Sequence, residues 1–164
     1  MPKKRLSHVD AEGHARMVDV GAKPVTRRRA SAAGWIRMSR ECFALVKANR
    51  IAKGDVLRLA EIAGIAAAKR TAELIPLCHP LPLEKVSVSC RLDARLPGVR
   101  VTSEAKVEAK TGVEMEALTA GAVALLTVYD MCKAADPAME IGGLHLVEKS
   151  GGLTGEWKVS SPES

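Results

Sequence analysis

Apolar and polar residues alternate along the stretch from Val25 to Met38, VTRRRASAAGWIRM. A period of two places successive side chains on opposite faces of an extended chain, which is typical of a β-strand with one buried face. The pattern therefore predicts a long strand over residues 25–38. Its smaller and more apolar face would carry Arg28, Ala30, Ala32, Gly34, Ile36 and Met38.

Two helical segments are predicted after this strand. Residues 40–50 have a helical period, and in residues 55–74 apolar residues recur at spacings of three and four. Asp55 is suited to the N-cap of the second segment, because its side chain can accept a hydrogen bond from a free amide of the first turn. Prolines at positions 76, 80 and 82 would end that helix, since proline has no amide hydrogen to donate.

Beyond the prolines, extended segments flank one more helix. Residues 85–92 and 99–107 each place apolar residues on one face, and the turn DARLPG between them predicts a hairpin. Residues 139–149 form a last extended segment after the long helix described below.

The order strand, helices, hairpin, helix and strand indicates an α+β fold, with a ferredoxin-like antiparallel sheet and helices packed on one face. A chain of 164 residues is long enough to bury about two thirds of the surface that it exposes when unfolded. We predict a single domain over residues 1–164, with flexible ends at about 1–16 and 159–164.

Composition and charge limit the classes of partner. The formal charge of +6 favours an anionic partner, which leaves nucleotides, nucleic acids and acidic membranes open. Aromatic residues make up only 2% of the chain, and RNA-binding sheets of this type depend on stacked aromatics, so an RNA-binding function is disfavoured. The sequence has neither a signal-peptide core nor a run of about 20 apolar residues. We therefore expect a soluble, cytoplasmic protein without membrane contacts.

The four cysteines lie far apart in the sequence, without a C-x-x-C pair. Their spacing matches neither a disulfide framework nor the usual ligand spacing of a zinc site. We expect reduced thiols at all four positions, which are Cys42, Cys78, Cys90 and Cys132.

A long apolar helix is predicted from Val113 to about Ala135. Thr111 and Glu114 have the spacing of a capping box at its start. Glu114 and Glu116 would lie in the first turn, where the helix dipole favours anions, so a structural role is the simplest explanation for both.

Asp130 and Lys133 share a face near the end of the same helix, three residues apart. They could supply a proton acceptor and a proton donor, although spacing alone favours a surface ion pair. Asp130 follows Glu116 by 14 residues, which is ~21 Å along a helix axis. One small ligand cannot contact both on a single chain. The ligand would have to be extended, like a nucleoside triphosphate, or the site would take residues from two subunits.

Two basic residues are weaker candidates. Lys53 stands just before Gly54 and Asp55, near a helix N-terminus that attracts phosphate or carboxylate, but a lone lysine there is usually solvated surface. Arg28 lies on the apolar face of the first strand and requires an anion, which could equally be a protein carboxylate or a ligand phosphate.

The stretch IPLCHPLPL, residues 75–83, places a cysteine and a histidine between three prolines. Prolines restrict both themselves and the preceding residues, so the loop would be stiff and could hold His79 in a fixed position. Cys78 and His79 would point apart on an extended backbone, which argues against a nucleophile and its base, and a metal site would need further ligands. From the chemistry alone, a structural connector is favoured over a ligand-binding loop.

Several motifs in a fixed order resemble the cyclic pyranopterin monophosphate synthase family, the C proteins of molybdenum cofactor biosynthesis (MoaC family). The likeness covers roughly residues 6–159, and the combination of the fourth and fifth motifs below, LCHPL and GVEMEALTA, is highly specific. In chain order they are MVDV, KGDV, AGIAAAKRT, LIPLCHPL, GVEMEALTA within KTGVEMEALTA, YDMCKA and KSGG.

The resemblance implies an enzyme, a lyase that converts (8S)-3′,8-cyclo-7,8-dihydroguanosine 5′-triphosphate to cyclic pyranopterin monophosphate and releases diphosphate, with no cofactor and no metal. It implies catalytic roles for Lys53, Asp130 and Lys133. It implies substrate binding by Leu77, Cys78, His79, Glu114, Met115 and Glu116, and we add Arg28 and Lys69 as possible phosphate contacts. For the proton transfers we expect a lysine whose pKa is lowered by its surroundings.

The family is hexameric, a trimer of dimers with active sites at subunit interfaces, so the resemblance also implies a homohexamer. Two rival interpretations stay open from the residues alone. One is a non-catalytic ferredoxin-like module that binds nucleotide or RNA, and the other is a catalytically silent subunit of the assembly.

Overall fold

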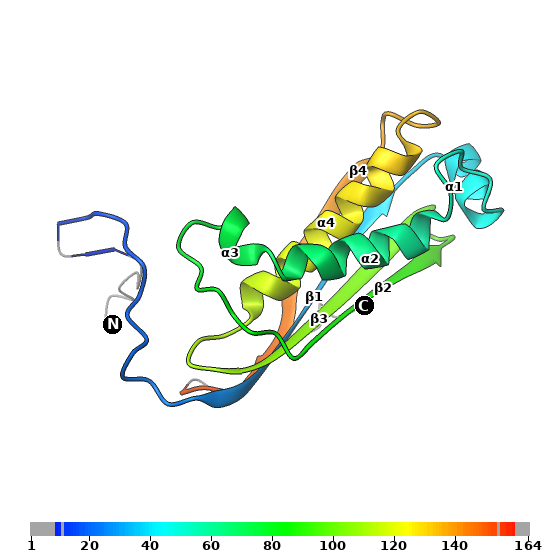
Figure 1. Cartoon of the computed structure of the whole chain (residues 1–164). Coiled ribbons are helices and arrows are strands. Elements are labelled where there is room, and N and C mark those ends of the chain that lie inside the picture. The colour runs from blue at the N-terminus through cyan, green and yellow to red at the C-terminus, as the bar shows by residue number, and fades with distance from the viewer. Residues whose placement is uncertain (1–8, 11, 154, 160–164) are drawn as a thin grey trace.

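The computed structural model describes residues 9–10, 12–153 and 155–159 (Figure 1). Of the ends predicted to be flexible, residues 1–8 and 160–164 lie outside the described residues. The elements in chain order are β1 (Thr26–Arg37), α1 (Arg40–Lys47), α2 (Val56–Ala68), α3 (Thr71–Leu74), β2 (Lys85–Asp93), β3 (Gly98–Ala109), α4 (Glu114–Cys132), β4 (Glu140–Ser150) and β5 (Trp157–Lys158).

The strands form one antiparallel sheet in the order β2-β3-β1-β4-β5. The first four strands and their intervening helices follow the ferredoxin-like pattern, in which two β-α-β units interleave. Helices α2 and α4 lie across the same face of the sheet (Figure 1). The predicted α+β, ferredoxin-like fold is confirmed, and the short edge strand β5 is an addition that the sequence pattern did not indicate.

Strand β1 has the predicted alternation of faces. Ala30, Ala32, Gly34 and Ile36 are buried under the helices, while the residues between them are more exposed. Small residues are needed here because α4 lies close to the strand. A Cβ atom on Gly34 would lie 2.9 Å from Cδ1 of Leu125 in α4.

The segment predicted as one helix over residues 55–74 is two helices, α2 and α3. The Asp55 N-cap is confirmed, because its side chain accepts a hydrogen bond from the amide of Arg58 at 3.1 Å. The prediction of a single long helix was wrong. Thr71 is buried, and its hydroxyl donates to the carbonyl of Ala68 at 2.9 Å, so it binds the last carbonyl of α2 where the helix stops.

Helix α4 starts at Glu114, one residue later than predicted, and the expected capping box is not formed. Val113 is the N-cap residue and provides no side-chain cap. The carboxylate of Glu114 instead accepts a hydrogen bond from Nζ of Lys149 on β4, at 2.9 Å. The Glu114 carboxylate therefore binds a cation from the sheet. The predicted end at Ala135 is also three residues too far.

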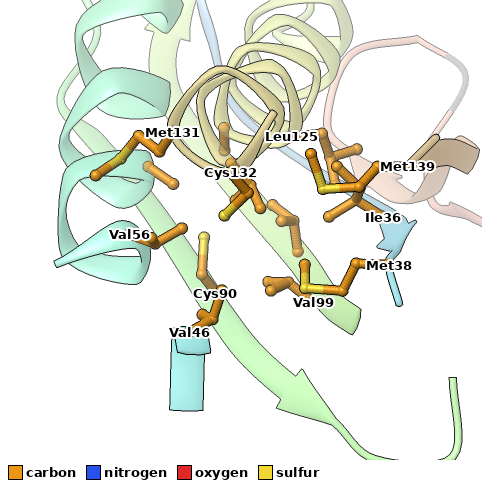
Figure 2. Packing of buried hydrophobic residues seen from close by; sticks show 14 of the residues in the cluster. Ile36, Met38, Val46, Val56, Cys90, Val99, Leu125, Met131, Cys132 and Met139 are labelled. Carbon is orange, nitrogen blue, oxygen red and sulfur yellow. The ribbon is translucent and has the colours of Figure 1, made fainter. Parts of the chain in front are cut away.

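The core is aliphatic and sulfur-rich, as the scarcity of aromatic residues requires. Its larger cluster lies between the second half of α4 and the sheet, with Cys132 of α4 at its centre and Met131 on the side of α2, near Val56 (Figure 2). Among the described helices, α4 is the one that is long and apolar enough to cross a membrane, but half of it is buried inside the fold. Its apolar composition is that of a core helix and does not indicate a membrane protein.

Candidate functional site

Lys53, Asp130 and Lys133 form a compact group at the C-terminal end of α4, named here the lysine–aspartate cluster. Nζ of Lys53 lies 2.7 Å from one carboxylate oxygen of Asp130 and 3.0 Å from its backbone carbonyl oxygen. Nζ of Lys133 lies 2.7 Å from the other carboxylate oxygen. The loop before α2 delivers Lys53 to this point, 77 residues from Asp130 in the sequence, with Gly54 adopting a left-handed backbone angle.

The charges of the lysine–aspartate cluster stabilise one another. Hydrogen bonds from Lys133 and then from Lys53 lower the pKa of Asp130 to about 2. Asp130 in turn raises the pKa of Lys133, chiefly through the hydrogen bond between them. The expectation of a lysine with a lowered pKa is therefore wrong for Lys133 in this chain, because its partner is a carboxylate and its side chain is exposed to solvent.

A pocket of about 280 Å³ lies at the other end of α4 and is named here the proline-loop pocket. It brings together the six residues predicted to bind substrate, three from the proline-rich loop and three from the first turn of α4. The full lining is Leu77, Cys78, His79, Leu81, Thr111, Gly112, Glu114, Met115 and Glu116.

Local hydrogen bonds fix the course of the proline-rich loop. The amide of Cys78 donates to the carbonyl of Ile75 at 3.1 Å, and the amide of Leu83 donates to the carbonyl of Leu81 at 3.0 Å. These bonds and the three prolines leave the loop little freedom, so Cys78 and His79 are presented to the pocket by a stiff backbone. The connector interpretation and the binding-loop interpretation are thus compatible, since the loop is both rigid and pocket-lining.

The carboxyl group of Glu116 differs from that of Asp130 although both are on α4. Glu116 is 4% exposed, and burial raises its pKa to about 6, with a further contribution from the charge of nearby Glu114. Burial also raises the pKa of the Cys78 thiol, again with a contribution from Glu116. At neutral pH, Cys78 in this pocket is a neutral thiol.

The two possible phosphate contacts lie apart. Arg28 lines a small cavity next to the proline-loop pocket, and its guanidinium donates to the backbone carbonyls of Ala109 and Lys110 at 3.0 and 3.1 Å. Lys69 is exposed at the C-terminal end of α2 and lines neither cavity. Lys149 lines the same small cavity as Arg28, and it was not among the predicted site residues although it begins the KSGG motif.

The remaining cavities add nothing to these groups. A cavity of about 280 Å³ beside β5 contains none of the predicted site residues. Within the part of the chain that the structure describes, no group of three or more His, Cys, Asp or Glu residues could hold a metal ion.

The proline-loop pocket and the lysine–aspartate cluster do not adjoin on one chain. Figure 1 shows α3 and the proline-rich loop near the start of α4, whereas the beginning of α2, which follows Lys53, lies toward its other end. Glu116 and Asp130 belong to the same continuous helix, which keeps them ~21 Å apart along its axis. Each chain therefore presents two separate groups of candidate residues.

Comparison with known proteins shows the family of the chain. The model of the MoaC family matches residues 17–152. Cyclic pyranopterin monophosphate synthase of Brucella melitensis biotype 2 is 55% identical over 160 residues, which cover 98% of this chain and 97% of that protein. The protein of the same name from Brucella ovis is 55% identical, over 96% of this chain and 96% of that protein. The one from Brucella suis biovar 1 is 54% identical, over 98% of this chain and 97% of that protein. On these matches, the chain belongs to the MoaC family.

Proposed function

We propose that this chain is a lyase that converts (8S)-3′,8-cyclo-7,8-dihydroguanosine 5′-triphosphate to cyclic pyranopterin monophosphate and diphosphate, in the biosynthesis of the molybdenum cofactor. The observation that carries the proposal is the meeting of Lys53 with Asp130 and Lys133, since three residues implied by the family resemblance converge from distant parts of the sequence. The printed names of relatives that share more than half of their residues with this chain support the same activity. A non-catalytic binding module is not favoured.

The proline-loop pocket suits the ring system of such a substrate. Leu77 and Met115 offer apolar contacts, while His79 and Glu116 offer hydrogen-bonding groups on the same pocket wall. A pocket of about 280 Å³ is near the lower end of the range for small-molecule sites, so it holds part of a nucleoside triphosphate rather than all of it. The triphosphate would extend beyond the pocket toward cationic groups.

The lysine–aspartate cluster suits the phosphate chemistry and proton transfer. When a ribose hydroxyl attacks the α-phosphorus, a new P–O bond forms, the bond to the β-phosphate breaks, and diphosphate leaves with additional negative charge. The ammonium groups of Lys53 and Lys133 would offset that charge, and Lys133 can donate a proton. Asp130, with a pKa of about 2, stays ionised and orients both ammonium groups, which makes it a weak base.

A complete site would combine the proline-loop pocket of one subunit with the lysine–aspartate cluster of another. The ~21 Å between the two groups supports this arrangement, because the reacting ring and the α-phosphate of one substrate lie closer together than that. We further propose a homohexamer built as a trimer of dimers, located in the cytoplasm, with Arg28 and Lys69 as phosphate contacts. The conversion of this substrate to product and diphosphate involves no net oxidation or reduction, so it requires no redox cofactor.

The direct test is to incubate the purified protein with the cyclic dihydro-GTP intermediate and to measure the pterin product and diphosphate together. Wild-type protein should form both in equal amounts, and Asp130→Asn should lose most of the rate. Asp93→Asn is the matched control, because Asp93 is also a carboxylate paired with a basic residue, Arg100, but it lies away from both groups. Absence of product from the wild type, or an unimpaired Asp130→Asn variant, would refute the proposal.

A further inference from the structure

Asp136 is a buried carboxylate in the connection between α4 and β4, three residues after Lys133. One of its oxygens accepts a hydrogen bond from the backbone amide of Ser39 at 2.7 Å, and the other accepts one from the amide of Ala138 at 3.0 Å. These amide bonds lower the pKa of the carboxyl group and offset the cost of burying its charge. Both oxygens are used inside the protein, so the side chain has one fixed orientation.

The bond to Ser39 joins two segments that are 97 residues apart in the sequence. Ser39 is the N-cap of α1, and its hydroxyl accepts a hydrogen bond from the amide of Cys42 at 3.2 Å. The start of a helix carries partial positive charge, which an ionised carboxylate stabilises. Asp136 therefore ties the first turn of α1 to the segment that follows α4.

Helix α1 leads to Lys53 through a short turn with its own hydrogen bonds. The amide of Arg50 donates to the carbonyl of Leu45 at 2.9 Å, and the amide of Gly54 donates to the carbonyl of Ile51 at 3.0 Å. Ile51 also packs against the larger core cluster. The turn has little freedom, so a shift of α1 would be passed on to Lys53.

The segment that contains Asp136 is held equally closely to the helix that carries Asp130. The hydroxyl of Tyr129 donates to the carbonyl of Pro137 at 2.9 Å, and the amide of Asp136 donates to the carbonyl of Cys132 at 3.1 Å. Asp136 is thus fixed relative to the end of α4, and through Ser39 it fixes α1 relative to the same end.

Apolar contacts also hold α1 in place, but they constrain its position less. Cys42 and Val46 are the buried residues of α1, and the thiols of Cys42 and Cys132 form a hydrogen bond. The hydrophobic effect has no preferred direction, whereas a hydrogen bond weakens steeply when its donor and acceptor are displaced or misaligned. The bond from Ser39 to Asp136 adds a directional constraint that apolar packing lacks.

We propose that Asp136 is a positioning residue for the lysine–aspartate cluster: it holds the start of α1 and thereby keeps Nζ of Lys53 within hydrogen-bonding distance of Asp130. The catalytic part of this inference rests on the proposed function. Lys133 reaches Asp130 from three residues further along the chain, and its amide bonds the carbonyl of Tyr129, so this contact does not depend on α1. Loss of Asp136 should separate Lys53 from Asp130 and leave Lys133 in place.

Cross-linking with a carbodiimide measures the two lysine contacts separately. The reagent joins a carboxylate and an adjacent amine in an amide bond and takes up the water that is released. Mass spectrometry of the wild type should find Asp130 linked both to Lys53 and to Lys133. Asp136→Ala should lower the ratio of the first link to the second at least about fivefold, because Nζ of Lys53 leaves hydrogen-bonding distance. An unchanged ratio would overturn the proposal.

A change at the other end of the bond tests the same contact with Asp136 intact. Ser39→Pro removes the amide hydrogen, and the φ of −61° at this position suits proline. Ser39→Ala removes the cap hydroxyl but retains the amide. The link ratio should fall further in Ser39→Pro than in Ser39→Ala, and equal ratios in the two variants would overturn the proposal even if Asp136→Ala does not fold.

Asp93→Ala controls for general loosening of the protein. Asp93 is also a carboxylate that accepts backbone amides, those of Arg95 at 2.9 Å and Leu96 at 3.4 Å, but at the turn between β2 and β3. This variant should retain the wild-type link ratio and circular dichroism spectrum. An equal fall of the ratio in Asp93→Ala and Asp136→Ala would overturn the proposal.

Turnover tests the catalytic part. Asp136→Ala should lower kcat about 10- to 100-fold, the cost of a misplaced catalytic group. Its KM should change less than about threefold, because the ring is held in the proline-loop pocket at the other end of α4. A wild-type kcat in Asp136→Ala would overturn the catalytic part. Link ratios that change as expected in a protein whose wild type forms no product would refute the proposed function and support the positioning of Lys53 by Asp136.

Discussion

The two ends of α4 shift the pKa of a carboxyl group in opposite directions. At the N-terminal end burial raises the pKa of Glu116 to about 6, and at the C-terminal end two lysines lower that of Asp130 to about 2. The first end is a pocket with an apolar wall, and the second is an exposed set of charges. One end is therefore suited to hold a ring and exchange a proton near neutral pH, and the other to hold phosphate.

The contrast also shows what each end lacks as a candidate site. The cations in the cavity next to the proline-loop pocket, Arg28 and Lys149, are bound to backbone carbonyls and to Glu114, respectively. The lysine–aspartate cluster has cations but does not line the proline-loop pocket. Each end offers what the other lacks, and the proposed function combines the two ends from different subunits.

Removal of a cluster lysine should give the largest effect. We expect Lys53→Ala to lower kcat by about 10²–10⁴, the usual contribution of a positioned acid or electrostatic group. The variant leaves Asp130 paired with Lys133 alone, so the fold should be preserved. Lys47→Ala, at an exposed lysine in the last turn of α1, is the control. A Lys53→Ala variant with more than half of the wild-type kcat would contradict a catalytic role.

Mixing two inactive variants should restore activity if the ends belong to one shared site. His79→Ala damages only the pocket and Lys53→Ala only the cluster, so a mixed dimer has one undamaged site and one doubly damaged site. After random exchange of equal amounts, half of the dimers are mixed, and the activity should approach about one quarter of the wild-type value. Rates that stay at the level of the separate variants, with subunit exchange verified by mass spectrometry, would show that each chain works alone.

The fold was largely predictable because its signals are local. The alternation in β1 follows from one buried face, and the Asp55 cap and the hairpin depend on neighbouring residues. The errors arose where a distant residue changed a local preference. Lys149 engages, from 35 residues away, the Glu114 carboxylate that the expected capping box would have used, which no pattern around Thr111 could indicate.

The candidate site was harder to predict from sequence patterns than the fold. Spacing alone made Asp130 and Lys133 a surface ion pair and Lys53 a solvated lysine, because the contact between Lys53 and Asp130 spans 77 residues. The family resemblance supplied the grouping that spacing could not. The direction of a pKa shift depends on burial and on the distance to charged neighbours, so the expected lowering at Lys133 was wrong.

The opposite pKa shifts predict opposite effects on stability. Glu116 binds its proton more tightly in the folded state, so its contribution is favourable below pH about 4.5 and is lost as pH rises through about 6. Relative to Glu116→Gln, the wild type should lose up to about 2 kcal/mol of unfolding free energy across that window. The contribution of Asp130 to stability has the opposite pH dependence, because its pKa is lowered in the folded state. Relative to Asp130→Asn, this contribution to the free energy of unfolding is present above pH about 4 and is lost as pH falls toward about 2.

Urea unfolding at a series of pH values, at constant protein concentration, measures both differences. Parallel pH profiles for the wild type and Glu116→Gln would contradict burial of an ionisable carboxyl group in the pocket.

The smallest effect is expected at Cys78. The hydrogen bond from the Cys78 amide to the carbonyl of Ile75 shapes the proline-rich loop, and a serine at this position can form the same backbone hydrogen bond. Its thiol is neutral at pH 7 because burial and Glu116 raise its pKa, so no thiolate is present to act as a nucleophile. Cys78→Ser should therefore lower kcat/KM by only about two- to fivefold, the value of one modest contact. A loss of a hundredfold or more, with the loop geometry unchanged, would require a chemical role for the sulfur, and the pocket would then do more than hold the ring.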